Sequence, residues 1–135
     1  MRTILLVEDD ELLRTLVYCA PSSHYNVLTA SDSRMAFSTF HAHSDDIDIL
    51  LIDAGLPYLN GRDLATMIDG VRPGIKCLVM SGDPGSALPS PNHPRRWWFI
   101  AKPFSISDLS TMIEQVLAAP DDPYGWARVT SWWRH

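Results

Sequence analysis

Short apolar runs alternate with stretches of helical periodicity along the chain, and this alternation predicts its secondary structure. Runs of four to six residues bounded by polar or turn residues are typical of buried strands in a parallel sheet. Five such runs occur: Ile4–Val7, Tyr25–Ala30, Ile47–Ile52, Lys76–Met80 and Trp97–Ile100. The second run has the weakest apolar content, so we expect it near an edge of the sheet.

Between these runs, apolar residues recur every three or four positions, as on one face of a helix. Four helices follow, with apolar positions Leu12, Leu13, Leu16, Val17 and Ala20; Ala36, Phe37 and Phe40; Leu64, Met67, Ile68 and Val71; and Leu109, Met112, Ile113, Val116 and Leu117. Pro21 ends the first helix, and Pro73-Gly74 ends the third. Ser105 and Asp108 resemble a capping box at the start of the last helix.

The stretch between the fourth and fifth strands departs from this alternation, because it contains Pro84, Pro89, Pro91 and Pro94. A proline inside a helix removes a backbone donor and clashes with the preceding turn, at a cost of about 3 kcal/mol. We therefore expect the helix between these two strands, which would be the fourth in chain order, to be short or replaced by a proline-rich loop.

The end of the chain forms a separate segment, so we expect one domain over residues 1–119 and a C-terminal tail over 120–135. The tail begins with the linker-like Asp121-Asp122-Pro123 and is then rich in apolar residues: Tyr124, Trp126, Val129, Trp132 and Trp133. Apolar tails must be covered by something. Two interpretations stay open, a short aromatic helix docked on its own domain and a segment for homodimerisation or partner binding.

Composition narrows the class of protein. With 135 residues, 46% hydrophobic and 20% charged, the chain is typical of one soluble globular domain. The net charge of −5 argues against a nucleic-acid partner. No apolar stretch approaches the roughly 20 residues that cross a bilayer, and the N-terminal run is too short for a signal peptide, so we expect a cytoplasmic protein without a membrane partner. Cys19 and Cys77 have no C-x-x-C spacing and are expected to be buried free thiols.

Candidate functional residues follow four of the five apolar runs, directly or, for Lys102, after Ala101. They are Glu8-Asp9-Asp10, Asp53, Ser81-Gly82 and Lys102-Pro103. Parallel strands bring their C-terminal ends to one edge of the sheet, where open α/β sheets bind ligands. An acid after the first strand would alone be explained as a helix cap. Together with Asp53, these acids favour an acidic pocket that also contains a hydroxyl and a cation.

Four motifs in this order resemble a known family: Leu6-Val7-Glu8-Asp9-Asp10, Asp53-Ala54-Gly55-Leu56-Pro57-Tyr58-Leu59-Asn60-Gly61, Val79-Met80-Ser81-Gly82 and Lys102-Pro103-Phe104. Over residues 2–119 the chain is similar to the CheY-like receiver domains of two-component response regulators. The resemblance implies a flavodoxin-like, doubly wound, five-stranded parallel sheet of order 2-1-3-4-5 with helices on both faces. It also implies a regulator rather than an enzyme, with only Mg²⁺-dependent self-phosphorylation and autodephosphorylation.

The resemblance also assigns the chemistry. Asp53 matches the phosphoacceptor, which takes a phosphoryl group from a histidine kinase or phosphotransfer protein. The Mg²⁺ ligands would be Asp9, Asp53, the Gly55 carbonyl and, directly or through water, Glu8. Asp10 is expected to begin the loop into the first helix instead.

The remaining matches concern the response to phosphorylation. Lys102 would pair with Asp53 before phosphorylation. Ser81 and Lys102 would contact the phosphoryl group, and the Lys102–Pro103 bond would be cis. Phe99 would be the switching aromatic that signals to an unidentified downstream protein, although a plain core position also explains it. Asp83, two residues after Ser81, is our own candidate for a residue that alters the lifetime of the phosphate.

Three other functions are compatible with a fold of this kind. The first is a pseudo-receiver, a protein-interaction module that works without phosphorylation, and the complete pocket argues against it. The second is an aspartate-nucleophile phosphatase, which needs a second Asp where this chain has Gly55. The third is a flavodoxin-like FMN binder, which needs a phosphate loop after the first strand. The chain is either a stand-alone regulator or a receiver taken from a larger protein.

Overall fold

The computed structural model describes residues 1–19, 24–82 and 97–119 of the chain. These residues form a five-stranded parallel sheet of order β2-β1-β3-β4-β5, as the resemblance implied. The strands are β1 (Thr3–Val7), β2 (Asn26–Ala30), β3 (Ile49–Asp53), β4 (Lys76–Ser81) and β5 (Trp97–Ala101). The weakly apolar β2 forms one edge of the sheet, as predicted from its composition.

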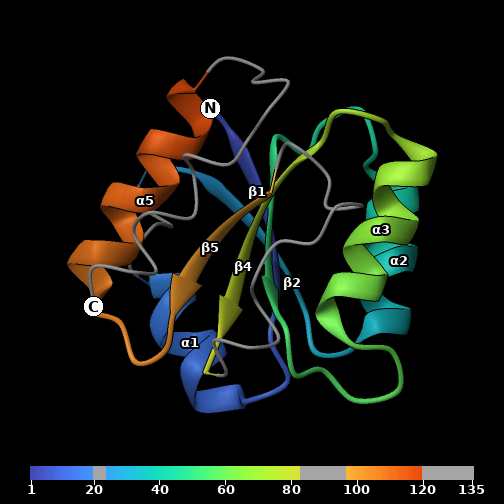
Figure 1. Ribbon diagram of the computed structural model, residues 1–135. Coiled ribbons are helices and arrows are strands. Elements are labelled where there is room, and N and C mark those ends of the chain that lie inside the picture. The colour runs from blue at the N-terminus through green and yellow to red at the C-terminus, as the bar shows by residue number, and fades with distance from the viewer. Residues whose placement is uncertain (20–23, 83–96, 120–135) are drawn as a thin grey trace.

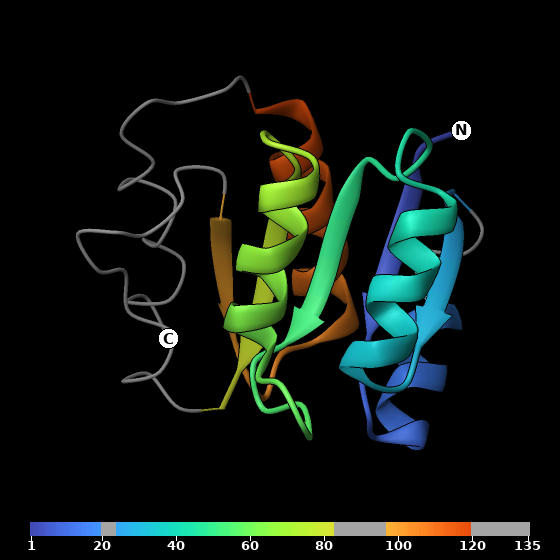
Figure 2. The ribbon, with the colours of Figure 1, turned by 90° about the vertical axis from the view of Figure 1, so that its right-hand side faces the viewer.

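Four helices in the described part of the chain cover both faces of the sheet (Figure 1). They are α1 (Glu11–Cys19), α2 (Ser33–Ala42), α3 (Gly61–Val71) and α5 (Ile106–Ala118). Helices α1 and α5 lie on one face, and α2 and α3 lie on the other (Figures 1 and 2). The proline-rich segment 84–94 and the tail 120–135 lie outside the described residues, and so does Asp83.

The core has two apolar layers, one on each face of the sheet. Successive strand residues point alternately to the two faces. Leu5, Val7, Leu50 and Ile52 pack towards α2 and α3, whereas Ile4, Leu6, Ile49 and Leu51 pack towards α1 and α5. Burial on both faces explains why these strands are continuous apolar runs in the sequence.

Polar side chains cap the beginnings of the helices. The side chains of Asp32, Asn60 and Ser105 accept hydrogen bonds from backbone N–H groups at the starts of α2, α3 and α5. Asp10 Oδ1 accepts from the N–H groups of Leu12 and Leu13, at 2.9 and 3.2 Å. Asp10 therefore serves the start of α1, which agrees with its predicted place outside the ligand set.

A lysine serves the opposite end of α5. Lys76 Nζ, at the start of β4, donates to the carbonyl oxygen of Val116 at 2.8 Å and also to those of Leu117 and Ala119. The last carbonyls of a helix have no partner within the helix and carry its negative partial charge. The ammonium group therefore satisfies these carbonyls and ties α5 to the sheet.

Two predictions about α1 are wrong. Leu12 and Leu16, expected to face the core, are 72% and 53% exposed, whereas Val17 is fully buried. The apolar stripe of α1 is wider than its contact with the sheet, so Leu12 and Leu16 remain at its outer margin. Cys19, expected to be buried, is exposed at the end of α1, while Cys77 is buried in β4 as expected. No helix in the described ranges is long and apolar enough to cross a bilayer.

Candidate functional site

Three ionisable side chains meet at the C-terminal edge of the sheet. Glu8 follows β1, Asp53 ends β3 and Lys102 follows β5. Lys102 Nζ lies 3.0 Å from Glu8 Oε1 and 3.2 Å from Asp53 Oδ1. The resemblance implied the pair of Lys102 with Asp53, whereas the closer pair with Glu8 was not predicted.

Asp9 completes an acidic cluster with these two carboxylates. Carboxylate oxygens of Glu8, Asp9 and Asp53 lie within 4.8 Å of one another. Glu8 is fully buried and Asp53 is 7% exposed, whereas Asp9 is exposed, so the cluster opens to solvent beside Asp9. Three carboxylates with an open side form the hard oxygen donor set that Mg²⁺ prefers.

Backbone groups hold the two buried carboxylates in place. The Gly55 N–H donates to Asp53 Oδ1 at 3.1 Å, and the Asp10 N–H donates to Glu8 Oε2 at 3.3 Å. Arg14, on α1, donates from Nη1 to the backbone oxygen of Glu8 at 2.8 Å. The acids are therefore oriented by the loops that carry them and by the first helix.

The two buried acids have opposite pKa shifts. Burial raises the pKa of Glu8 to about 7, and the adjacent Asp53 adds to this rise. Burial also tends to raise the pKa of Asp53, but hydrogen bonds with Glu8, the Gly55 amide and Lys102 outweigh it and hold that pKa below its usual range. Two close carboxylates resist simultaneous ionisation. Asp53 therefore carries the negative charge first, and the proton resides on Glu8.

Lys102 remains a cation in this setting. Burial tends to lower its pKa, but its hydrogen bond to Glu8 and the negative charge of Asp53 outweigh burial and raise the pKa. The backbone N–H of Lys102 donates to the Ser81 carbonyl oxygen at 2.8 Å, and this bond joins the ends of β4 and β5. The Lys102–Pro103 bond is cis, as the resemblance implied.

Ser81 and Phe99, two of the residues predicted to respond to phosphorylation, lie on the neighbouring strands β4 and β5. Ser81 ends β4 and is 2% exposed. Phe99 is fully buried in β5, in the apolar layer that faces α2 and α3. The register places Val79 beside Phe99 and Ser81 beside Ala101.

Gly61 is a supporting residue that the sequence analysis missed. A Cβ atom at this position would lie 2.1 Å from the carbonyl oxygen of Asp53 and 2.7 Å from Ile52 Cγ2. Only glycine lets the start of α3 approach the end of β3 this closely. Its place directly after Asn60, the residue that caps α3, was the available sequence indication.

Comparison with known proteins establishes the family. Residues 4–114 match the family model described as the response regulator receiver domain. The chain therefore belongs to the response regulator receiver domains of two-component signalling, which are not conventional enzymes.

Curated relatives agree with this assignment. The chain is 31% identical over 121 residues to the response regulator receiver protein CpdR of Brucella abortus (strain 2308), and the match covers 88% of this chain and 99% of that one. It is 30% identical over 122 residues to the sensor kinase CckA of the same organism, and this match covers 88% of this chain but 13% of the kinase. The chain therefore matches the whole of one relative and a small part of the other.

Solved structures show the same fold. A response regulator receiver domain protein from Clostridium thermocellum has a TM-score of 0.78 at 22% identity, with 87% of this chain and 94% of that chain covered. The receiver domain of NtrX from Brucella abortus has a TM-score of 0.74 at 26% identity, with 87% and 99% covered.

Proposed function

We propose that this chain takes a phosphoryl group onto Asp53 from a histidine kinase or phosphotransfer protein and then regulates a downstream protein. The observation that carries the proposal is the state of Asp53 at the C-terminal edge of the sheet. Its carboxylate is held ionised by the Gly55 amide and by Lys102 Nζ at 3.2 Å. An ionised, oriented carboxylate is the form that acts as a nucleophile.

The metal proposed for this site is Mg²⁺. Glu8, Asp9 and Asp53 offer the carboxylate oxygens, and the Gly55 carbonyl is the fourth proposed ligand. Bound Mg²⁺ would supply positive charge that neutralises the oxygens of the transferred group. Because burial raises the pKa of Glu8 to about 7, metal binding near neutral pH would release a proton from the protonated fraction of Glu8.

The transfer step needs little beyond position and charge. An oxygen of Asp53 forms a bond to phosphorus while the bond from phosphorus to the donor's imidazole nitrogen breaks, and that nitrogen keeps the electron pair. Lys102 stands beside Asp53 and would neutralise charge on the phosphoryl oxygens. Since Lys102 is already paired with both acids, its ammonium group stands beside Asp53 before the phosphoryl group arrives.

The response would pass through residues 81 and 99 within the receiver unit 1–119. Ser81 is buried at the end of β4 and would donate its hydroxyl to the new phosphoryl oxygens. Phe99 is buried in the next strand and would report that movement to the surface beside β5. A change of local charge that is read by a neighbouring side chain is a common switch.

The exposed margin of α1 is the surface that we propose for the phosphodonor protein. Leu12 and Leu16 lie one helical turn apart and are exposed on the helix that begins beside Glu8 and Asp9. A donor that delivers phosphate to Asp53 must rest close to this helix. Exposed leucines there would provide apolar contact area for the donor.

The test is intact-mass measurement after incubation with acetyl phosphate or phosphoramidate and Mg²⁺. The wild type should gain the mass of one phosphoryl group, and Asp53→Asn should gain none. Asp63→Asn, an exposed acid on α3, is the matched control and should behave as the wild type. Absence of modification with every donor, including phosphorylated histidine proteins, would contradict the proposal and favour the pseudo-receiver.

The role of Asp83 needs a separate measurement. We propose that it alters the lifetime of the phosphate, by repelling the phosphoryl group or orienting a water molecule. Equal dephosphorylation rates in the wild type and Asp83→Ala would refute this role and leave the rest of the proposal intact.

A further inference from the structure

The outer edge of β2 has hydrogen-bonding groups directed away from the sheet. Among the described residues, β2 has a neighbouring strand on one side only, and Figure 2 shows it at the right-hand edge. The Asn26 N–H donates to the Arg2 carbonyl, and the Ala30 carbonyl accepts from the Glu8 N–H. Backbone groups alternate in direction along a parallel strand. Asn26, Leu28 and Ala30 therefore direct their backbone groups towards β1. The backbone groups of Val27 and Thr29 point outward.

Nothing in the sequence of β2 opposes pairing with another strand. Edge strands are commonly protected by lysine, other charges, proline or bulges. The strand Asn26–Ala30 contains none of these residue types and pairs with β1 in regular register. Its first residue is exposed, and the next three are half-buried. A short, uncharged and regular edge is suited to accept one more strand.

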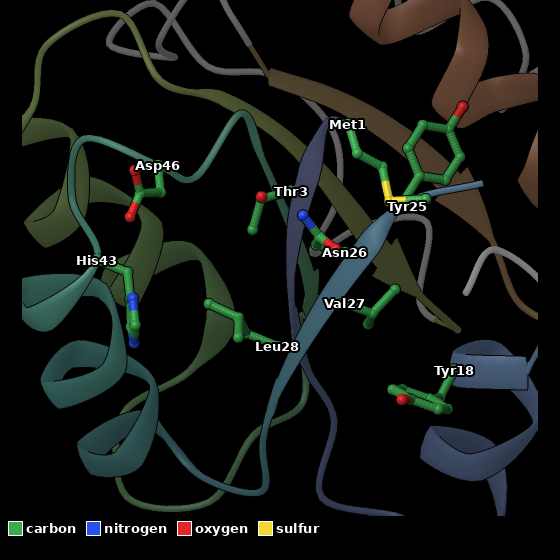
Figure 3. Close-up of a pocket in the computed structure, with 9 residues that line it drawn as sticks. All are labelled: Met1, Thr3, Tyr18, Tyr25, Asn26, Val27, Leu28, His43 and Asp46. Atoms are coloured by element: carbon green, nitrogen blue, oxygen red, sulfur yellow. The ribbon is translucent and has the colours of Figure 1, made fainter. Parts of the chain in front are cut away.

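Space is available for the side chains of an added strand. A hollow of about 630 Å³ surrounds the first part of β2 (Figure 3). Tyr18, Tyr25 and Val27 line it on the face of the sheet that α1 and α5 cover, whereas Leu28 and His43 line it on the side of α2. Because the side chains of a strand alternate between the two faces of a sheet, an added strand would place its own side chains on both faces, next to those of β2.

We propose that β2 pairs with β2 of a second copy of this chain, antiparallel and centred on Leu28. In this register Val27 of each copy lies opposite Thr29 of the other, so outward groups meet outward groups in about four main-chain hydrogen bonds. Continued beyond the strand ends, the register sets His24 opposite Asp32. A side chain that can donate a hydrogen bond therefore faces a carboxylate at both ends of an otherwise uncharged pair.

This complementarity between His24 and Asp32 favours a second copy over an unrelated peptide. A two-fold axis makes each contact occur twice, so one complementary pair of residues serves both ends of the interface. A strongly acidic or basic peptide would find no row of opposite charge along β2. The interface would be small, and the dimer should therefore be weak and dependent on concentration. It lies along one edge of the sheet and leaves the carboxylates beside Asp9 accessible.

The test is sedimentation velocity of the full chain up to roughly 1 mM, the range in which weak association of about −4 kcal/mol is visible. The mass should rise from 15.2 kDa towards twice that value as concentration increases. Thr29→Pro removes an outward N–H that the pairing needs, so this variant should remain a monomer. It should still fold, because proline is tolerated in an edge strand. Thr29→Val keeps the N–H and should still dimerise. Circular dichroism verifies that each variant is folded.

A second variant and a direct probe complete the test. Thr29→Lys keeps the backbone donor but adds a charge to the edge, and it should also prevent dimerisation. In hydrogen exchange, the amides of Val27 and Thr29 should become more protected as concentration rises. A chain that stays monomeric, or a dimer that persists in folded Thr29→Pro and Thr29→Lys, would overturn the proposal. So would concentration-dependent protection elsewhere with none in β2.

Discussion

Lys102 Nζ lies closer to Glu8 Oε1 than to Asp53 Oδ1, at 3.0 and 3.2 Å. One ammonium group thus joins a buried acid with a raised pKa to the carboxylate that holds the charge. The cation is shared before any phosphoryl group arrives, so its removal should affect both acids.

Replacing Lys102 should slow phosphorylation of Asp53. In Lys102→Gln the positive charge beside Asp53 is lost, so negative charge on the transferred group is less well neutralised. We expect the rate with a small phosphodonor and Mg²⁺ to fall about 100- to 1,000-fold. Time-resolved intact-mass measurement gives this rate. Arg34→Gln, an exposed basic residue on α2, should leave it unchanged. An unaltered rate in Lys102→Gln would remove Lys102 from the mechanism.

The raised pKa of Glu8 should make stability depend on pH when EDTA keeps divalent cations away. The unfolded chain loses the Glu8 proton near pH 4.5, whereas the folded chain keeps it until about pH 7. Rising pH therefore favours unfolding across this window, by about 3 kcal/mol at most. The lowered pKa of Asp53 acts oppositely, and its contribution is lost only as the pH falls below the usual range of an aspartate.

Urea unfolding between pH 4.5 and 8 measures this effect. Glu8→Gln cannot ionise and should show a flatter profile than the wild type over the same range. If the two profiles have the same slope, Glu8 does not titrate with a raised pKa in the folded chain.

A methyl group at Gly61 should damage both stability and the site. In Gly61→Ala the new Cβ would meet the Asp53 carbonyl oxygen at 2.1 Å, so α3 or the end of β3 must shift. Such overpacking costs about 1–3 kcal/mol. Gly70 lies in the same helix, and a Cβ added there would have nothing within 4 Å, so Gly70→Ala should stabilise the chain by about 0.5–1 kcal/mol. Denaturant unfolding compares the pair, and equal effects would show that the close approach is not rigid.

The exposed leucines of α1 should matter for a protein donor and not for a small one. Leu12→Ser with Leu16→Ser should slow transfer from a phosphorylated histidine protein that phosphorylates the wild type, by about 10-fold for the loss of an interface contact of ordinary strength. The rate with acetyl phosphate should not change. Met35→Ser with Met67→Ser, which alters two other exposed apolar residues, is the control. Equal slowing by both donors would indicate damage to the pocket instead.

Lys76 should contribute to stability from outside the site. Lys76→Met keeps the length of the side chain but removes the donor to the last carbonyls of α5. We expect a loss of about 1–2 kcal/mol in the free energy of unfolding, with phosphorylation of Asp53 unaffected. Urea unfolding and intact-mass kinetics on the same variant separate the two outcomes. A stability equal to that of the wild type would mean that water replaces the ammonium group at no cost.

Periodicity predicted most of the fold, because buried parallel strands and amphipathic helices leave distinct patterns. It was misleading in α1 and α3, where Leu12, Leu16, Met67 and Val71 have the spacing of core residues but are exposed. A pattern shows which residues share a helix face, and it cannot show how much of that face the sheet covers. Cys19, which was predicted to be buried in α1, is exposed for the same reason.

The residue types at the strand ends predicted which side chains gather at this edge, and the resemblance implied the pair of Lys102 with Asp53. Neither predicted the closer pair with Glu8 or which acid is buried. Glu8 and Asp9 are adjacent in sequence, yet one is fully buried and the other exposed. Which acid turns inward depends on how β1 leads into α1, where Asp10 and Arg14 hold the side chain and backbone of Glu8. Such three-dimensional support leaves no mark in the spacing of the motifs.

The two lysines of this chain have a practical consequence for chemical labelling. The sequence has no others, and one is hydrogen-bonded to helix α5 while the other lies between two acids. Apart from the amino terminus, reagents that attack amines therefore meet only engaged ammonium groups. Any occupant that changes the surroundings of Lys102 should alter its rate of acylation, which makes this side chain a built-in reporter that requires no engineered tag.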